Sequence, residues 1–308
     1  MSIMNRNAFA HLKEWKQRQK RKPLVLRGAR QVGKSYLVEA FAKREFEASL
    51  TVNADRDRAF LQRIVHEPPS RMVQLLELEY GQRIIPGKTL LFFDEIQAVP
   101  EFLARLRYFY EELPDLHVVA AGSLLDFVLE DHSFSMPVGR IEYLHLGPMT
   151  FGEFLDATGN ERWSAFLSAF GCRETMPDTA HQSLLRLFRT FLALGGMPEA
   201  IATYARTLSL LEADRVKESI LGTLRDDFTK YGPRVNQKRL HKMFGRLPGM
   251  VGQRFKYANV SREDSARELA RSLHLLELAR TVLRMEKPFR LVPVRSWTGK
   301  LHDPGWRN

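Results

Sequence analysis

The chain has 308 residues, of which 44% are hydrophobic and 27% charged, as in globular proteins with more than one domain. No apolar stretch approaches the roughly 18 residues of a membrane span, and the N-terminus lacks the apolar core of a secretory signal. The single cysteine, Cys172, excludes an intramolecular disulfide and a cysteine-based metal cluster, so we expect a cytoplasmic protein.

The formal net charge of +11 is concentrated in the last third of the chain. Residues 201–308 contain 22 Lys/Arg and 11 Asp/Glu, whereas residues 1–200 contain 25 of each. Within this third, residues 228–262 carry nine cations and no acid. Clustered cations bind nucleic acid by releasing phosphate counterions, so this segment predicts nucleic-acid binding. A solvated basic face is the alternative.

Strands and helices alternate along the first 150 residues. A helix is predicted over residues 8–22, and helical spacing recurs near 57–66, 70–80 and 103–109. Short apolar runs predict strands at residues 24–26, 49–53, 88–97, 116–123 and 141–146. Two of these runs, 88–97 and 116–123, are apolar on both faces, as in a buried parallel sheet. The pattern predicts an α/β sandwich, followed after Pro148 by helices alone.

Residues 28–35, GARQVGKS, match the phosphate-binding loop G-x-x-x-x-G-K-[ST] (Walker A) at every fixed position. The glycines let backbone amides approach phosphate oxygens, and the helix that follows adds its positive N-terminal end. The Lys34 ammonium is predicted to bind the β- and γ-phosphates, and the Ser35 hydroxyl to ligate Mg²⁺. The predicted nucleotide-binding residues are Gly28, Ala29, Arg30, Gln31, Val32, Gly33, Lys34, Ser35 and Tyr36. For Arg30, a phosphate contact and simple exposure are both open, and we favour exposure.

Two acids close the apolar run LLFF in the second half of the predicted core. Asp94 stands where the acid that holds Mg²⁺ is expected, at the carboxyl end of a strand (Walker B). Glu95 directly follows it, and a second carboxylate beside the metal suits the activation of water. The pair therefore favours hydrolysis over phosphoryl transfer to the hydroxyl of a small molecule.

Two further residues are candidates for the catalytic site. Ser123 ends the next buried strand, where its hydroxyl can contact the γ-phosphate and the attacking water, or cap the following helix. Arg140 precedes the last predicted strand, where it can stabilise the transferred phosphoryl group in its own subunit or in a neighbour. An exposed loop arginine is the alternative.

With these residues in place, the chain resembles the prokaryotic AAA-type P-loop ATPases that carry a C-terminal domain of unknown function. The resemblance rests on LVLRGARQVGKSYL, LLFFDEIQ, AAGSLLDF, VGRIEYLHLGPMTFGEF, LGGMPEA and LPGMVGQRFKYANVSREDSARELARSLHLLELA. It implies a three-layer P-loop NTPase sandwich of the additional-strand type, with a strand inserted between the loop strand and the acid strand. It also implies ATP and Mg²⁺ as ligands and the same roles for Lys34, Ser35, Asp94, Glu95, Ser123 and Arg140.

The resemblance further implies three domains. We expect an ATPase core over residues 1–149, an all-α lid over 150–230 and a basic winged-helix-like segment over 231–308. After Val282 the sequence departs from these relatives and continues as a tail without periodicity, which predicts a truncated C-terminal part.

The predicted function is an ATP-hydrolysing molecular switch that moves its basic C-terminal segment on DNA or on a protein partner. A nucleic-acid-binding protein that holds nucleotide without turnover is the alternative. A small-molecule kinase is disfavoured by Glu95 and by the helical extension. No membrane association is expected, and the sequence leaves the oligomeric state open.

Overall fold

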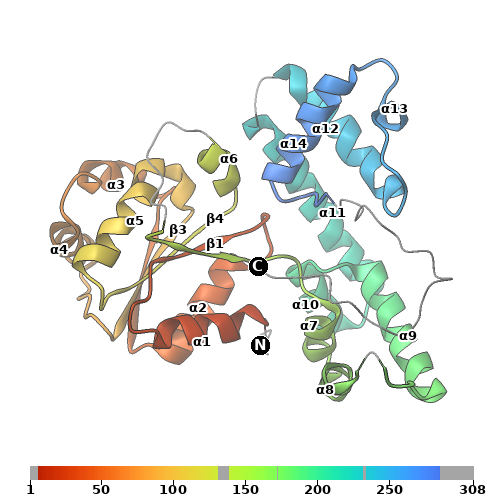
Figure 1. The fold of residues 1–308 in the computed structure, drawn as a ribbon, viewed down its shortest axis with the longest axis horizontal. Helices are drawn as coiled ribbons and strands as arrows, with labels where there is room; N and C mark the ends of the chain where they lie inside the picture. Colours follow the sequence, from red (N-terminus) through yellow and green to blue (C-terminus); the bar gives the residue numbers. More distant parts are fainter. Residues whose placement is uncertain (1–5, 131–138, 172, 232–233, 285–308) are drawn as a thin grey trace, which may run out of the picture.

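The computed structural model describes residues 6–130, 139–171, 173–231 and 234–284. Cys172 and the predicted tail over 285–308 lie outside these ranges. An α/β part built around the sheet lies beside a helical part that contains the second half of the chain (Figure 1). None of the helices in the described ranges combines the length and hydrophobicity that a bilayer span needs.

Five parallel strands form the sheet, in the order β2-β3-β4-β1-β5. The strands are β1 (Leu24–Arg27), β2 (Ala48–Asn53), β3 (Thr89–Asp94), β4 (His117–Gly122) and β5 (Glu142–His145). Because β4 lies between β1 and β3, the predicted added strand is confirmed. The register pairs Arg27 with Gly122, so β1 and β4 end side by side at the same edge of the sheet.

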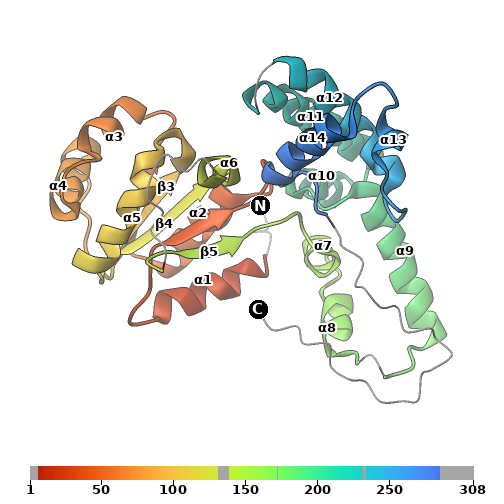
Figure 2. The same ribbon diagram turned by 45° about the horizontal axis from the view of Figure 1, so that its top comes forward.

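Helices cover both faces of the sheet (Figure 2). They are α1 (Ala8–Gln17), α2 (Lys34–Glu45), α3 (Arg58–Ile64), α4 (Pro69–Tyr80), the short η1 (Ile96–Ala98), α5 (Pro100–Glu112) and α6 (Leu125–Glu130). Leu26 and Phe92 pack in a cluster with α1 and α2, whereas their neighbours Val25 and Phe93 pack with α3, α4 and α5. Strand residues alternate between two buried faces, which explains the continuous apolar runs and confirms the predicted sandwich.

The first helix is shorter than the sequence predicts. It ends at Gln17, and Arg18 is extended, with φ −72° and ψ 129°. The Trp15 indole donates a hydrogen bond of 2.8 Å to the Lys22 carbonyl. The basic residues after Gln17 therefore lead into β1 and do not continue the helix, so that part of the prediction was wrong.

After β5 the described chain contains only helices, as predicted. The first group is α7 (Phe151–Ala157), α8 (Glu161–Ala169), α9 (Asp178–Leu194), α10 (Pro198–Thr207) and α11 (Leu210–Asp226). Thr150 and Glu153 form a capping box that begins α7. Met149, Phe154 and Leu155 pack with residues of α9, α10 and α11 in a separate hydrophobic cluster.

The second helical group forms the C-terminal segment. It comprises η2 (Asp227–Lys230), α12 (Arg234–Arg246), η3 (Leu247–Met250), α13 (Tyr257–Val260) and α14 (Ala266–Leu278). Its hydrophobic cluster includes Phe228 and Tyr231 as well as residues of α12 and α14. The core of this segment therefore begins before the predicted boundary at residue 231. The domain limits themselves stay a prediction.

Candidate nucleotide-binding site

The loop between β1 and α2 is shaped by its two fixed glycines. A Cβ at Gly28 would collide with the carbonyl oxygen of Leu146 beyond β5. Gly33, immediately before α2, has φ +85°, a left-handed conformation that favours glycine. The loop therefore packs closely against β5 and places the N-terminus of the twelve-residue helix α2 at its end.

A pocket of about 220 Å³ lies against this loop. Its lining residues are Arg30, Gln31, Gly33, Lys34, Ser35, Tyr36, Glu95, Ser123 and Thr223. They come from the loop, from the carboxyl ends of β3 and β4, and from α11. The structure thus brings the predicted loop, the second acid and the predicted serine to one pocket. Thr223 was not predicted, because it lines this pocket together with a loop almost 200 residues earlier in the chain.

Lys34 is buried at the base of this loop. Its ammonium donates hydrogen bonds to the carbonyls of Gly28, at 3.1 Å, and Ala29, at 2.8 Å. Burial lowers the pKa of Lys34 to about 8, against the opposing charges of Glu95 and Asp94. A buried cation suits the binding of a polyanion.

The two predicted magnesium ligands lie in contact. The Ser35 hydroxyl donates a hydrogen bond of 2.7 Å to Oδ2 of Asp94. Burial raises the pKa of Asp94, and the hydrogen bond that it accepts from Ser35 acts to lower it. The described residues hold no group of three or more His, Cys, Asp or Glu side chains that could bind a metal ion. One hydroxyl and one carboxylate fit Mg²⁺, which takes few protein ligands and completes its shell with phosphates and water.

Glu95 and Ser123 meet at the pocket. The Glu95 backbone is left-handed, with φ +50°, a conformation uncommon outside glycine and often found at functional sites. Its Oε2 accepts a hydrogen bond of 3.4 Å from the buried Ser123 hydroxyl and another from the Gln97 amide. Ser123 therefore turns toward the acid at the pocket, and its contact with the γ-phosphate stays a prediction.

Arg30 is not simply exposed, so our preferred interpretation was wrong. Its guanidinium lines the pocket, and its Nε lies 2.8 Å from Oδ2 of Asp227, a buried residue of η2. The other carboxylate oxygen of Asp227 lies 3.1 Å from Lys230. The loop that is predicted to bind phosphate thus forms an ion pair with the start of the C-terminal segment.

Arg140 does not reach the pocket of its own chain. Its Nε lies 3.0 Å from Glu111 in α5, and the side chain is half exposed. Arg140 precedes β5, whose first residue, Glu142, pairs with Leu24 at the amino edge of the sheet. The pocket lies at the opposite, carboxyl edge. A role in its own subunit is therefore unsupported, and a role in a neighbour's pocket stays a prediction.

Arg6 stabilises the phosphate loop by a hydrogen bond to its backbone, and the sequence analysis did not predict this role. Its guanidinium donates to the carbonyls of Val32, at 2.8 Å, and Gly147, at 2.7 Å. Its Nε donates to Glu153 of the α7 capping box at 3.1 Å. Arg6 and Glu153 are almost fully buried. A lone arginine before the first helix carries no motif, so no local signal could have revealed this contact.

The helix that follows Ser123 packs against the C-terminal segment. Leu124 and Phe127 contact its hydrophobic cluster, and the rings of Phe127 and Tyr231 lie 5.0 Å apart. Asp126 accepts hydrogen bonds of 3.0 and 2.9 Å from Arg280, just beyond α14, and also pairs with Arg27 at the end of β1. Through these contacts, α6 and the end of β1 are both connected to the C-terminal segment.

The basic segment is partly neutralised in the fold. Arg239 and Lys242 contact Asp264 at 2.9 and 2.8 Å, because the acids that follow the segment in sequence fold back against α12. Five other cations of the segment are exposed and form no ion pair within the described residues: Lys238, Arg246, Arg254, Lys256 and Arg262. The charge available to a partner is therefore smaller than the sequence suggests.

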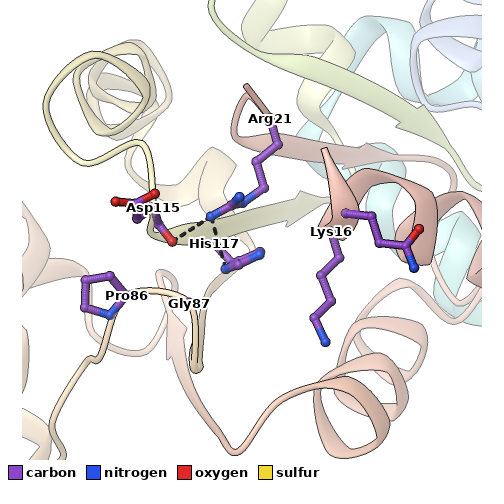
Figure 3. Close-up of a pocket in the computed structure, with 7 residues that line it drawn as sticks. Lys16, Arg21, Pro86, Gly87, Asp115 and His117 are labelled. Carbon is purple, nitrogen blue, oxygen red and sulfur yellow. Dashed lines mark hydrogen bonds between the residues drawn. The ribbon is translucent and has the colours of Figure 1, made fainter. Parts of the chain in front are cut away.

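A larger cavity, of about 510 Å³, lies at the amino edge of the sheet (Figure 3). There Arg21 donates a hydrogen bond of 2.6 Å to the Asp115 carbonyl and lies 3.3 Å from Nδ1 of His117. Burial, then the charge of Arg21, lowers the pKa of His117 to about 4. These polar groups contact one another, and none of the predicted site residues lines this cavity. We therefore place the nucleotide site in the smaller pocket.

Comparisons with known proteins bear on both halves of the chain. Residues 20–155 match a family model described as an AAA domain, and residues 185–293 match one described as a domain of unknown function, DUF8612. No curated protein matches the chain.

Solved structures with a similar arrangement include three with low identity. C. elegans PCH-2 is 12% identical, with 69% of this chain and 67% of that chain covered and a TM-score of 0.41. Aeropyrum pernix ORC1 in complex with DNA is 14% identical, with 89% and 83% covered and a TM-score of 0.37. Aeropyrum pernix ORC2 in ADPNP-ADP complexes is 11% identical, with 90% and 89% covered and a TM-score of 0.43. Such scores transfer neither activity nor partner to this chain.

The family match and the structure agree on the N-terminal half. The matched range contains the complete five-stranded sheet, the glycine loop and both acids. Residues 20–155 therefore form an AAA domain with the P-loop NTPase fold.

Proposed function

We propose that the chain is an ATP-hydrolysing molecular switch in which Mg-ATP binding and hydrolysis reposition the basic C-terminal segment. The observation that carries this proposal is the pocket at the carboxyl edge of the sheet, which gathers the glycine loop, Glu95 and Ser123. Asp94 lies beside it, bonded to Ser35. A kinase of small molecules has no need of Glu95 at this position.

Each residue has a distinct task in this proposal. The loop amides and Lys34 bind the β- and γ-phosphates, while Ser35 and Asp94 hold Mg²⁺, which when bound neutralises charge on the phosphates. Glu95 orients the attacking water and accepts its proton as the γ-phosphoryl group leaves ADP. Ser123 connects this acid to the γ-phosphate.

Two contacts support coupling between the nucleotide and the C-terminal segment. Arg30 in the loop pairs with Asp227, and α6 directly after Ser123 packs on the cluster that contains Tyr231. A phosphate that draws Arg30 or Ser123 toward itself therefore changes the surroundings of residues that hold the segment. A ligand shifts the equilibrium between two positions of the segment only if its contacts differ between them. The Arg30–Asp227 pair and the packing of α6 are the contacts that we expect to differ.

The direct test is phosphate release from Mg-ATP by the full chain, with Lys34→Ala as the inactive variant. We expect wild-type turnover to fall by about 100-fold or more in Lys34→Ala, because a cation on the transferred phosphates is lost. Thermal unfolding of both proteins controls for a folding defect. Equal turnover in the two proteins would contradict the proposal. Tight nucleotide binding without any turnover in the wild type would favour the alternative, a nucleotide-holding nucleic-acid-binding protein.

That alternative, and the choice of DNA as partner, rest on the exposed cations of the C-terminal segment. We expect Arg254→Ala combined with Lys256→Ala to weaken binding of double-stranded DNA. The slope of log affinity against log salt should decrease in magnitude by about 1.8, since each phosphate contact contributes about 0.9. Titrations of labelled duplex at several salt concentrations measure both quantities.

A matched control removes two exposed cations from the other end of the molecule. Arg63 and Arg83 lie near α3 and α4, far from the C-terminal segment (Figure 1). Arg63→Ala combined with Arg83→Ala changes the net charge equally and should leave the slope unchanged. Equal losses in the two double variants would indicate a general charge effect and would count against a defined DNA surface.

A further inference from the structure

Glu95 is held by a residue that no motif assigns. Gln97 lies in η1, two residues beyond Glu95, and its amide nitrogen donates a hydrogen bond to Oε2 of Glu95. The Ser123 hydroxyl donates to the same oxygen. Within the described residues, the other carboxylate oxygen, Oε1, accepts no hydrogen bond from a side chain or backbone group. One oxygen of Glu95 is thus fixed, and the other is free to accept from water.

Gln97 is itself tightly enclosed. A Cβ at Gly122, the last residue of β4, would collide with the side-chain oxygen Oε1 of Gln97, so a larger residue there would displace the Gln97 amide. The same oxygen is buried and has no hydrogen-bond partner among the described residues. A buried acceptor without a partner is costly and calls for an explanation. Reversing the amide would place its oxygen against Glu95 Oε2, which is less favourable still.

Two unfavourable features therefore meet at one carboxylate. Glu95 has a left-handed backbone, and Gln97 leaves an acceptor unpaired in order to direct its NH₂ group at Glu95. Strain of this kind persists where the surrounding structure holds it, and it is concentrated at functional sites. A buried glutamine with a packing role alone would be expected to have both its amide oxygen and its amide nitrogen hydrogen-bonded.

We propose that Gln97 is a positioning residue for ATP hydrolysis that holds the Glu95 carboxylate with Oε1 available to the attacking water. This role rests on the proposed ATPase function. The Gln97 amide is neutral and takes no proton, so it acts through Glu95 alone. Its hydrogen bond restricts the rotation of the carboxylate, and a base held in place transfers a proton more efficiently than a mobile one. Gly122 leaves the space that the Gln97 amide occupies.

The test compares Gln97→Met with Gln97→Glu. Methionine keeps the length of the side chain but removes the donor, and we expect kcat to fall by about 10- to 100-fold with KM for ATP within about twofold of wild type. Glutamate keeps the length of the side chain but replaces the NH₂ donor with a carboxylate that repels Glu95, so kcat should fall at least as far as in Gln97→Met. KM for ATP should again stay within about twofold of wild type, a split that a purely structural role would not produce.

Gly122→Ala provides a second approach that leaves Gln97 unchanged in sequence. The added methyl group displaces the Gln97 amide, so kcat of the Gly122→Ala variant should fall as in Gln97→Met. Gln82→Met is the matched control, because within the described residues the Gln82 amide donates only to the Ser49 carbonyl, at 3.2 Å, away from the pocket. This variant should keep the wild-type kcat. Thermal unfolding of each variant separates misfolding from a kinetic effect.

The outcomes distinguish this proposal from the function on which it rests. Wild-type turnover together with an unchanged kcat in Gln97→Met and Gly122→Ala would overturn the role of Gln97 alone. A fall in kcat with an equal rise in KM, or with a matching loss of thermal stability, would overturn it too, since Gln97 would then act on binding or on folding. A wild-type chain that binds ATP but releases no phosphate would overturn the proposed function and this role with it.

Discussion

Glu95→Gln is expected to stop ATP turnover while nucleotide binding is retained. The glutamine has the same size but accepts no proton from water, so hydrolysis should slow by about 10²- to 10⁴-fold, the usual contribution of a general base. Binding should persist because Glu95 is not a member of the loop, and the groups that are predicted to bind phosphate and Mg²⁺ remain. The variant should therefore hold ATP for long periods.

Two measurements check this expectation. Single-turnover phosphate release gives the rate of the chemical step, and binding of a fluorescent ATP analogue gives the affinity. Glu101→Gln is the matched control, since Glu101 is an exposed acid in the first turn of α5 and should leave both quantities unchanged. Wild-type turnover in Glu95→Gln would remove Glu95 from the mechanism. A parallel loss of affinity would instead make Glu95 a binding residue.

Glu153→Ala is expected to lower the free energy of unfolding by about 3–5 kcal/mol. The substitution leaves the Arg6 guanidinium buried without its counter-charge, and a buried charge that loses its partner is strongly destabilising. The backbone amides of Asn7 and Thr150 lose their acceptor in the same substitution, at 2.7 and 2.8 Å. The effect should exceed that of any exposed ion pair in the molecule.

Urea unfolding followed by circular dichroism and by tryptophan fluorescence measures this loss. Arg215→Ala serves as the control: it breaks an exposed pair with Glu212, at 2.9 Å, and should cost less than about 1 kcal/mol. ATP affinity should also fall in Glu153→Ala, because Arg6 supports the loop through the Val32 carbonyl. A loss below about 1 kcal/mol in Glu153→Ala would show that the buried pair is not needed for stability.

Local patterns in the sequence were enough to predict the strands and the loop. Apolar runs marked the five strands, whereas the strand inserted between the loop strand and the acid strand was predicted from the resemblance to AAA-type ATPases. The end of the first helix was misplaced because the charged residues after Gln17 are compatible with a helix. There the backbone follows the contact of Trp15 with Lys22, which no local pattern reveals.

The same distinction applies to the site. Residues that carry a motif, such as Lys34 and Asp94, were found because their chemistry requires particular types at particular spacings. Arg6 and the pairing of Arg30 with Asp227 were missed because they join segments about 150 to 200 residues apart. Gln97 lay within a recognised stretch but had no assigned task until its contact with Glu95 was seen. Long-range pairing is therefore the part of the site that one sequence does not supply.

The hydrophobic cluster around Phe228 has a consequence for the way the molecule can be divided. Two residues packed against it, Leu124 and Phe127, belong to the AAA domain, so that domain covers part of the core of the C-terminal segment. Truncating the chain before η2 would expose the apolar residues Leu124 and Phe127 beside Ser123 and would promote self-association. Substitutions in the two halves are therefore coupled at this contact. Replacing the C-terminal segment by an unrelated one would require compensating substitutions at Leu124 and Phe127.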